Sequence, residues 1–446
     1  MISKNDTVRA EITDMTPEGY GVCRIDGFVL FIAGTAVGDI VDAHILKVAK
    51  SYGYAKVIKI ITPSRDRVLP ECTAFPSCGG CVFRHITYEK ELEIKKNIID
   101  ENFARIGGLD IKCEKIIPSP QETGYRNKAE YPASGASGQM RLGFYARHSH
   151  RVVPCEDCPL QPAFYSDIVR AVECFCDEYK IPAYDEKSGK GLLRHLYIRD
   201  GRESGEVAVC LVATGDLPHS DVLCERLAKI NPNIRSITLN VNKEDTNVIL
   251  SDKFKTLSGK DTIRDVLCGV EFEISPRSFY QVNHDGAEKL YSLAAELAEP
   301  EGKTVLDLYC GTGTIGLTMA RRAKKLIGVE IIPEAVKNAR ANAKRGGIEN
   351  AEFICGDAGE IAERLSAEYS PDVVIVDPPR GGCSGDTLET IAKMSPERIV
   401  MISCNSATAA RDCAALQRLG FEPRRAVAVD MFPRTGHVEC AILLTK

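Results

Sequence analysis

A chain of 446 residues is long enough for about three domains, and its composition, 44% hydrophobic and 27% charged, is that of an ordinary globular protein. No apolar run approaches the ~18 residues of a membrane span, and the first residues lack the hydrophobic core of a secretion signal. We therefore expect a cytoplasmic protein whose 18 cysteines are reduced or metal-bound rather than paired. The net charge of −5 excludes a polycation, so any contact with nucleic acid must come from local basic patches.

Residues 1–62 alternate short β-rich runs with glycines, which predicts five short strands and a small β-barrel of the OB-like kind. Basic and acidic side chains are equally numerous in this segment, so its charge alone does not indicate RNA binding. The predicted strands are Val8 to Thr13, Gly19 to Val22, Phe28 to Ile32, Val41 to Val48 and Tyr54 to Ile61.

Cysteines cluster after the barrel. Cys72, Cys78 and Cys81 are followed much later by Cys158, and Gly79-Gly80 allows the backbone to wrap closely around one centre. Four thiolates could hold tetrahedral zinc or an iron–sulfur cluster, and the spacing does not choose between them. Cys155 competes with Cys158 as the fourth ligand. The alternative is a set of free cysteines in a cysteine-rich chain.

A helical pattern from Leu92 to Arg105 precedes a basic and aromatic segment from Tyr125 to Arg151. In that segment arginines and lysines outnumber acids and alternate with tyrosines and Phe144. Basic groups for phosphates and aromatic faces for unstacked bases are typical of single-stranded RNA binding. A solvated hairpin with core aromatics is the alternative. Residues 165–275 alternate helix and strand patterns and predict a mixed α/β domain.

The C-terminal third begins with a buried strand, Thr304 to Tyr309, and a glycine-rich turn, Cys310 to Gly316, that leads into a helix. Such a turn lets a ligand approach the backbone closely. The next strand ends in Glu330, where an acid binds ribose hydroxyls in nucleoside-binding α/β folds. A third strand ends at Asp357, and a fourth ends at Asp377-Pro-Pro-Arg380. The glycine-rich turn departs from the dinucleotide-binding fingerprint, and an Asp-Pro-Pro loop follows the fourth strand. Together these features favour S-adenosylmethionine over NAD as the cofactor.

Ile399 to Ile402 predicts the fifth strand of this sheet, with Cys404 just beyond its carboxyl end. Ser406 stands at the expected N-cap of a helix from Ala407 to Leu419. Runs near Val427 and Val438 would complete seven strands. Ligands of open α/β sheets bind beyond the carboxyl strand ends, so the Cys404 thiol would face them. The alternative is that Cys404 is a small hydrophobic side chain.

Six motifs together resemble the RumA-type 23S rRNA (uracil-5-)-methyltransferases, relatives of the tRNA uracil-5-methyltransferase, over nearly the whole chain. The barrel resembles a TRAM domain in Gly19-Tyr-Gly-Val and Ala36-Val-Gly-Asp. The motifs are the Cys78-Gly-Gly-Cys81 cluster, Ser278-Phe-Tyr-Gln-Val-Asn283, Asp307-Leu-Tyr-Cys-Gly-Thr-Gly313, Asp377-Pro-Pro-Arg380, Ser403-Cys-Asn405 and Gly436-His-Val-Glu439.

The resemblance implies an α/β chain of three domains: a TRAM-like barrel that binds RNA (1–62), a central domain with the iron–sulfur cluster and the RNA-contacting segment (63–280), and a Rossmann-like S-adenosylmethionine-dependent methyltransferase domain (281–446). It implies a cytoplasmic monomer that acts on 23S rRNA. Cys404 would be the nucleophile and Glu439 the base. The implied cofactor ligands are Gln281, Tyr309, Thr314, Glu330, Asp357 and Asp377. The implied ligands of a [4Fe–4S] cluster are Cys72, Cys78, Cys81 and Cys158, the last because the family has Cys-Pro there. The family usually has proline where Ser406 stands, which is a departure in the loop after the nucleophile.

The chemistry explains these residue types. Carbon 5 of uracil becomes nucleophilic only after a thiolate adds at carbon 6, and its hydrogen must then leave to a base. Glu439 lies in an apolar strand, where a carboxylate is costly unless it is used; a solvent-facing acid on an edge strand is the alternative. Arg380 could lower the thiol pKa or hold a uracil carbonyl. Three other functions remain open: tRNA uracil-5-methylation, a cytosine-5 or amino-methyltransferase, and a non-catalytic RNA-binding iron–sulfur protein.

Overall fold

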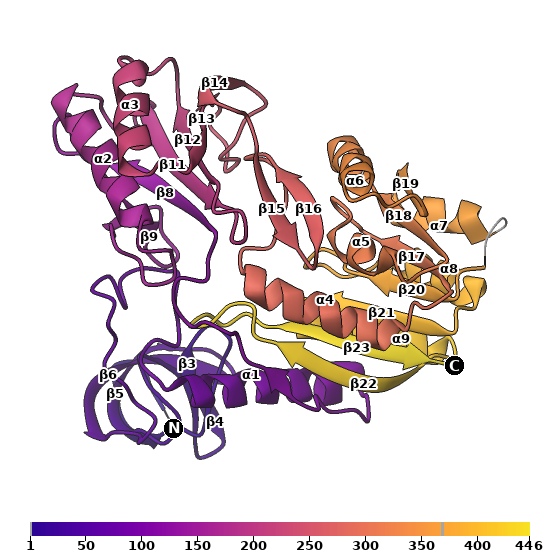
Figure 1. Ribbon diagram of the computed structural model, residues 1–446. Helices are drawn as coiled ribbons and strands as arrows, with labels where there is room; N and C mark the ends of the chain where they lie inside the picture. The colour runs from indigo at the N-terminus through magenta and orange to yellow at the C-terminus, as the bar shows by residue number, and fades with distance from the viewer. Residues whose placement is uncertain (1, 367–369) are drawn as a thin grey trace.

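The computed structural model describes residues 2–366 and 370–446. Within them the strands form a barrel-like sheet, a central sheet, a two-stranded ribbon and a large C-terminal sheet. Figure 1 shows the barrel at the lower left, the central domain above it and the C-terminal domain on the right. No helix of the described residues is long and apolar enough to span a membrane.

The N-terminal barrel has six strands in the order β1-β5-β6-β4-β3-β2, one more than the sequence predicts. The additional strand, β2, is only two residues long, too short for a visible alternation of apolar and polar residues. Inward side chains such as Leu30, Ile32 and Ala55 form the barrel core. The strands are β1 (Thr7–Glu11), β2 (Asp14–Met15), β3 (Tyr20–Ile25), β4 (Phe28–Ala33), β5 (Ile40–Val48) and β6 (Tyr52–Thr62).

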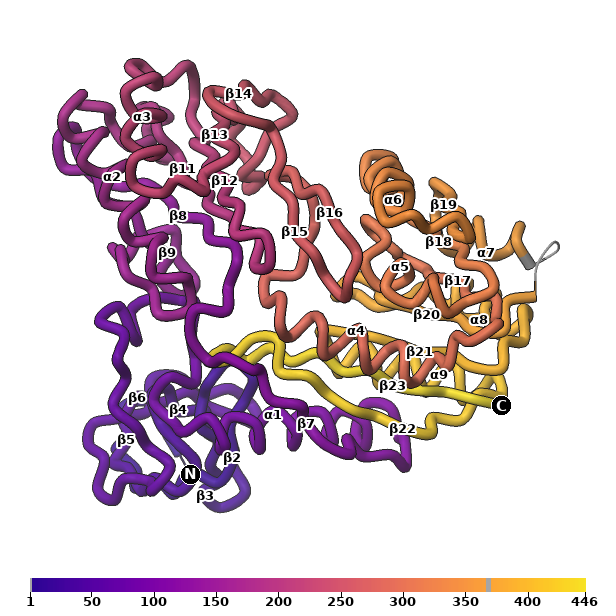
Figure 2. The backbone as a smooth tube through the Cα atoms, viewed as in Figure 1, coloured from indigo at the N-terminus to yellow at the C-terminus, as the bar shows by residue number. Residues whose placement is uncertain are grey.

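The segment after the cysteine motif packs on the C-terminal domain. Helix α1 (Tyr88–Asn102), capped by Thr87, continues into a π-helical turn, η1 (Phe103–Gly107). Ile99 and Phe103 lie in the apolar core beneath the C-terminal sheet. Strand β7 (Ile116–Ile117) then pairs in parallel with β22, so residues from within the range 63–280 form an edge of that sheet. The backbone trace in Figure 2 shows α1 and β7 beside β22 at the lower side of the C-terminal domain.

The central domain is a seven-stranded sheet in the order β10-β9-β8-β11-β12-β13-β14, covered by helices α2 and α3. A separate ribbon of β15 and β16 links it to the C-terminal domain. The elements are β8 (Lys128–Ser134), β9 (Arg141–Tyr145), β10 (Val152–Pro154), α2 (Tyr165–Glu178), β11 (Leu193–Asp200), β12 (Val207–Ala213), α3 (Ser220–Ile230), β13 (Ile234–Val241), β14 (Phe254–Gly259), β15 (Ile263–Leu267) and β16 (Val270–Ile274).

The C-terminal sheet has eight strands in the order β19-β18-β17-β20-β21-β23-β22-β7. The sequence predicts the first seven, and β7 is the eighth, supplied by two residues far from the rest. Among these described strands, β23 alone runs antiparallel to its neighbours, β21 and β22. The strands are β17 (Thr304–Leu308), β18 (Lys325–Glu330), β19 (Ala351–Cys355), β20 (Val373–Val376), β21 (Arg398–Ser403), β22 (Glu422–Val429) and β23 (Glu439–Thr445).

Helices cover both faces of this sheet, so its central strands are buried on both sides. One layer contains α4 (His284–Ala298), α5 (Thr314–Ala320) and α6 (Pro333–Arg345). The other contains α7 (Ala358–Ser366), α8 (Gly385–Met394) and α9 (Ser406–Arg418), together with α1. The predicted N-cap of α9 is wrong by one residue. Asn405 caps the helix by accepting from the Ala407 N–H, while Ser406 is already helical.

Buried charges hold the β22–β23 loop (residues 430–438) against α1. The Lys95 ammonium, which is 0% exposed, donates to Glu91 at 2.7 Å, to Asp430 at 2.8 Å and to the carbonyl of Phe432 at 3.1 Å. The Tyr88 hydroxyl donates to the other oxygen of Asp430. The loop that leads into Glu439 therefore depends on a cation supplied by α1.

We expect Lys95→Met to lower the free energy of unfolding of the C-terminal domain by about 3–5 kcal/mol, because two buried carboxylates lose their counter-charge. The matched control is Lys96→Met on the same helix. Lys96 is half-exposed and paired with Asp100, so its loss should cost about 1 kcal/mol or less. Urea unfolding followed by circular dichroism measures both variants. Equal midpoints for the two would contradict the buried ion network.

Candidate active site

Five neighbouring strands bring their polar ends to one edge of the C-terminal sheet. In the order β18-β17-β20-β21-β23, these ends carry Glu330, Tyr309, Asp377, Cys404 and Glu439. Because β23 is antiparallel, its first residue lies where the other strands finish. Ser403 of β21 pairs with Cys440 of the antiparallel strand β23. Cys404 follows Ser403 and Glu439 precedes Cys440, so these two residues lie opposite each other at the end of the strand pair.

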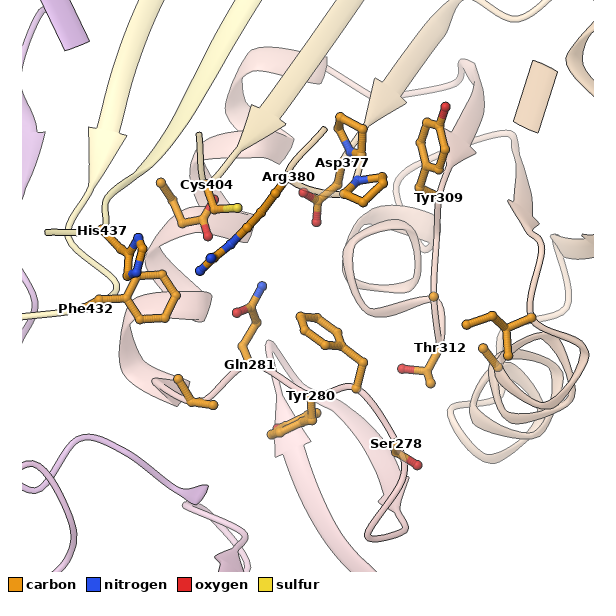
Figure 3. Close-up of a pocket in the computed structure, with 18 of the residues that line it drawn as sticks. Ser278, Tyr280, Gln281, Tyr309, Thr312, Asp377, Arg380, Cys404, Phe432 and His437 are labelled. Atoms are coloured by element: carbon orange, nitrogen blue, oxygen red, sulfur yellow. The ribbon is translucent and has the colours of Figure 1, made fainter. Parts of the chain in front are cut away.

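These strand ends open into a large pocket of about 1510 Å³ between the three domains. The barrel contributes Pro17 and Glu18, the central domain contributes Arg126 and Arg147, and the remaining wall comes mainly from the C-terminal domain. Figure 3 shows Gln281, Arg380 and Cys404 facing one another across its centre. Of the sequence-predicted site residues, the pocket wall includes Gln281, Tyr309, Glu330, Asp357, Asp377, Cys404 and Glu439.

Thr314 is the predicted cofactor ligand that does not line the pocket. Its hydroxyl accepts a hydrogen bond from the buried Tyr291 hydroxyl at 3.2 Å, and its side chain is 7% exposed. Thr312, in the same turn, lies in the pocket wall instead. A contact between Thr314 and the cofactor stays a prediction. In the structure the Thr314 hydroxyl contacts Tyr291, which belongs to helix α4.

The glycine-rich turn is shaped by left-handed backbone at Tyr309, Gly311 and Gly313, with φ of 63°, 55° and 81°. Glycine adopts this conformation without strain, whereas Tyr309 does so at a cost of about 1 kcal/mol. Glu330 accepts from the Gly311 N–H at 3.1 Å and from the Ile332 N–H at 2.9 Å. These bonds fix its carboxylate at the mouth of the turn, where an acid binds ribose hydroxyls.

The loop of Cys404 is tied to the neighbouring Asp-Pro-Pro-Arg loop. The Asn405 side chain donates to the carbonyl of Arg380 at 3.2 Å while it caps α9. Ser406, which replaces the family's proline, accepts from the Asn102 amide at 2.8 Å. The substitution therefore adds a contact to the end of α1 and leaves the thiol at the pocket wall.

Burial sets the protonation states at this edge. It raises the pKa of Cys404, the carboxylate of Glu439 adds to the increase, and the Arg380 guanidinium opposes it. Burial, with a contribution from Asp377, raises the pKa of Glu439 to about 8, again against Arg380. Burial also raises the pKa of Asp377 to about 7. The Arg380 guanidinium thus lowers the pKa of both the Cys404 thiol and the Glu439 carboxyl, while burial raises both.

Several pocket residues are absent from the set that the sequence predicts. The Phe279 ring is 65% exposed, and such an open aromatic face suits stacking on a planar base. His437 packs edge-on to Phe432 at 6.1 Å, and burial lowers its pKa, so it is neutral near pH 7. Phe279 and His437 lie inside two of the six family motifs, which is the signal that could have identified them. No sequence pattern marks Pro17 or Glu18.

A second cavity, of about 280 Å³, lies where the cysteines converge. Five thiols line it, those of Cys72, Cys78, Cys81, Cys155 and Cys158. Hydrogen bonding by Cys155 lowers the pKa of Cys72 to about 5, and Cys155 also lowers the pKa of Cys158. Cys155 thus lies within hydrogen-bonding reach of two of the predicted ligands.

Arg84 supplies a positive charge to this cavity. Its side chain contacts the Cys81 sulfur, yet its Nε and Nη2 atoms are buried with no hydrogen-bond partner among the described residues. An orphaned guanidinium beside thiols fits an anionic thiolate-bound group. Within residues 2–366 and 370–446 no three metal-binding side chains are grouped closely enough to hold one ion, so the ligand set stays a prediction.

A mostly parallel sheet with a glycine-rich turn, an acid at the end of the next strand and a pocket beyond the strand ends is typical of α/β enzymes that bind a nucleoside cofactor. The chain belongs to the tRNA (uracil-5-)-methyltransferase family, whose model matches residues 87–446, and a TRAM domain matches residues 3–58. The protein is thus an S-adenosylmethionine-dependent RNA methyltransferase, and the resemblance seen in the sequence is confirmed at this level.

Similar proteins span the whole chain. An uncharacterized RNA methyltransferase of Clostridium acetobutylicum is 41% identical over 100% of this chain and 98% of its own. Another, from Clostridium tetani, is 38% identical over 100% and 97%. Among solved structures, the Pyrococcus abyssi tRNA (uracil-54, C5)-methyltransferase in complex with S-adenosyl-L-homocysteine is 28% identical, with a TM-score of 0.80, over 98% of this chain and 100% of that one.

Proposed function

We propose that this protein methylates carbon 5 of a uridine in 23S rRNA through a covalent bond between Cys404 and carbon 6 of the base. The observation that carries the proposal is the placement of Cys404 opposite Glu439 at the wall of a pocket that also holds the predicted cofactor ligands. The pocket reaches all three domains, which suits a substrate as large as RNA. The target base must leave its stack to enter it.

The Cys404 thiolate adds to carbon 6, and the electrons of the 5,6 double bond move onto oxygen 4 to give an enolate. S-adenosylmethionine, when bound, would supply the methyl group from its sulfonium to carbon 5 and would be left as S-adenosylhomocysteine. Glu439 then removes the proton left on carbon 5, the double bond re-forms, and the thiolate leaves carbon 6. Arg380, beside both groups, stabilises the thiolate and is placed to bind a uracil carbonyl.

Four residues would hold the cofactor at the strand ends. Glu330, Asp357, Tyr309 and Asp377 all line the pocket, and the two acids Glu330 and Asp357 would bind the ribose and adenine. Gln281 approaches from the other side of the pocket (Figure 3). The backbone of the turn can approach the cofactor closely because Gly311 carries no side chain.

The substrate is tested by mass spectrometry of 5-methyluridine in 23S rRNA and tRNA, separated from a strain that lacks this protein. We expect the nucleoside to be lost from a 23S rRNA fragment and restored by the wild-type gene. Loss from tRNA alone would favour the second candidate, tRNA uracil-5-methylation, which the similarity to the Pyrococcus abyssi enzyme supports. Loss of a methylated cytosine or amine, or of no nucleoside, would overturn both.

We expect kcat, which includes the proton removal by Glu439 after methyl transfer, to rise with pH through about 8. The Glu439 carboxyl must be ionised to accept a proton, and its raised pKa of about 8 leaves it mostly protonated at pH 6–7. Cys404 must also be a thiolate, and its raised pKa moves the rise in the same direction. Steady-state methyl transfer measured from pH 6 to 9 checks this. A rate that is flat from pH 6 to 8 would contradict the assigned roles.

We also propose that Cys72, Cys78, Cys81 and Cys158 bind a [4Fe–4S] cluster, with Arg84 balancing its charge. Protein purified without oxygen should be brown and carry about four irons per chain. Cys78→Ser should lose most of the iron, whereas Cys174→Ser, an exposed cysteine on α2, should retain it. Elemental mass spectrometry measures the iron and zinc content of each protein. One zinc per chain in colourless protein would refute the cluster.

A further inference from the structure

Four aromatic rings form a continuous ladder on the outside of the barrel. Tyr20 on β3 contacts Tyr54 on β6 with ring centroids 5.7 Å apart, and Tyr54 contacts Phe31 on β4 at 5.5 Å. Tyr52 completes the ladder, 5.8 Å from both Phe31 and Tyr54. The rings come from three adjacent strands, β3, β4 and β6, at the lower left of Figure 1.

The barrel core does not require these rings. Side chains alternate between the two faces of each strand, and the interior is already filled by residues such as Leu30, Ile32 and Ala55. The ladder stands on the opposite face, and Tyr52 is 39% exposed. Contacts between the rings stabilise the folded barrel only modestly, so aromatic surface left on the outside of a sheet indicates a binding role.

The ladder is continuous with the active-site pocket. The Arg147 guanidinium lies 5.1 Å from the centroid of the Tyr20 ring and donates to the carbonyl of Glu18. Arg147 and Glu18 both line the pocket, together with Pro17 of the same turn. A chain that leaves the pocket past Arg147 would therefore meet Tyr20 first, then Tyr54, Phe31 and Tyr52.

Basic side chains flank the rings. Arg24 pairs across the strands with Val29, which is itself opposite Tyr52, and Lys56 lies two residues beyond Tyr54 on β6. Both cations are exposed, and neither forms an ion pair within the described part of the chain. Unpaired cations beside open aromatic faces match a negatively charged chain that carries planar groups.

We propose that this ladder binds unpaired nucleotides next to the target uridine, by stacking bases on Tyr54, Phe31 and Tyr52 while Arg24, Lys56 and Arg147 contact phosphates. The inference rests on the proposed function and adds a substrate requirement to it. Because stacking between neighbouring base pairs in a duplex covers both faces of each base, the RNA on this side of the target must be single-stranded. An OB-like barrel that uses aromatic stacking covers about 4–16 nucleotides.

The test measures the affinity of the full-length protein for a fluorescein-labelled 12-nucleotide oligouridine, alone or annealed to oligoadenosine, by fluorescence anisotropy. We expect Tyr52→Ala and Tyr54→Ala each to weaken binding of the single strand by about tenfold, and to leave the weaker binding of the duplex unchanged. The control is Ile58→Ala, a 56% exposed side chain farther along β6 that should change neither affinity. Thermal unfolding of each variant reports whether the barrel stays folded.

A second readout does not depend on substitutions. Photocrosslinking with 4-thiouridine in the 12-nucleotide strand should label peptides that contain Phe31, Tyr52 or Tyr54, as located by mass spectrometry. Unchanged single-strand affinity in folded variants would overturn the proposal and assign the ladder to another partner, such as a protein. Equal loss of single-strand and duplex binding would also overturn it. Both outcomes differ from failure of the proposed function, in which the deletion strain keeps all its 5-methyluridine.

Discussion

Cys404→Ala is expected to abolish methyl transfer to uridine, with a loss of activity on the order of 10⁴-fold or more, because carbon 5 is not activated without the thiolate at carbon 6. Cofactor affinity should survive, since Glu330 keeps its hydrogen bonds in the glycine-rich turn and Cys404 lies at the end of a different strand, β21. Transfer of a radioactive methyl group to RNA and calorimetric titration with S-adenosylhomocysteine measure the two effects separately.

The matched control is Cys355→Ala. Cys355 is also a strand-end cysteine of the same sheet, at the end of β19, but it is exposed and does not line the pocket. Its loss should leave activity within about twofold of wild type, since exposed substitutions away from a site have small effects. Near-normal methylation of uridine by Cys404→Ala would refute the covalent mechanism and leave the amino-methyltransferase type of direct transfer as the better explanation.

Much of the C-terminal domain can be predicted from the sequence because each functional residue follows a short apolar run. Parallel strands bring their carboxyl ends together, so the sequence alone predicts that Tyr309, Glu330, Asp377 and Cys404 lie at one edge of the sheet. Glu439 is harder to place, because it begins a strand. Its position opposite Cys404 depends on β23 being antiparallel, and a single apolar strand does not reveal its direction.

The remaining features depend on contacts between distant segments. Two residues, Ile116–Ile117, extend the sheet beside β22, and no pattern can be recognised in so short a run. The sequence predicts Ser406 as the cap of α9, but Asn405 is the cap, and Ser406 instead binds Asn102. For β7 and Ser406 a tertiary partner determines the role, and local spacing does not. The Thr314 hydroxyl accepts a hydrogen bond from Tyr291 of another helix, and its cofactor contact stays a prediction.

The same dependence on distant segments applies to the pocket wall. Pro17 and Glu18 come from the barrel and Arg126 from the central domain, more than 250 residues before Cys404. Arg126 lines both the large pocket and the cavity of the cysteines, so a thiol-bound cluster and the reacting base would share a wall. Loss of the cluster is therefore expected to affect RNA binding as well as folding.

Glu439→Gln should behave differently from Cys404→Ala, because Glu439 acts after the methyl group has moved. We expect one methyl transfer per enzyme, followed by accumulation of RNA joined covalently to Cys404, since the proton on carbon 5 has no base to accept it. Turnover should fall by about 10²–10⁴-fold. A denaturing gel would show the adduct as a slowly migrating band that carries both RNA and methyl label.

Three companion experiments make this result specific. The double variant Cys404→Ala/Glu439→Gln should give no band, because the adduct needs the thiol. Glu422→Gln, an exposed acid at the start of the adjacent strand β22, should turn over normally. RNA that contains 5-fluorouridine should trap the wild-type enzyme in the same way, because fluorine cannot leave carbon 5 as a proton does. If Glu439→Gln turned over at the wild-type rate without an adduct, the carboxylate opposite Cys404 would not be the base, and the proton would have to leave through another group at the pocket wall.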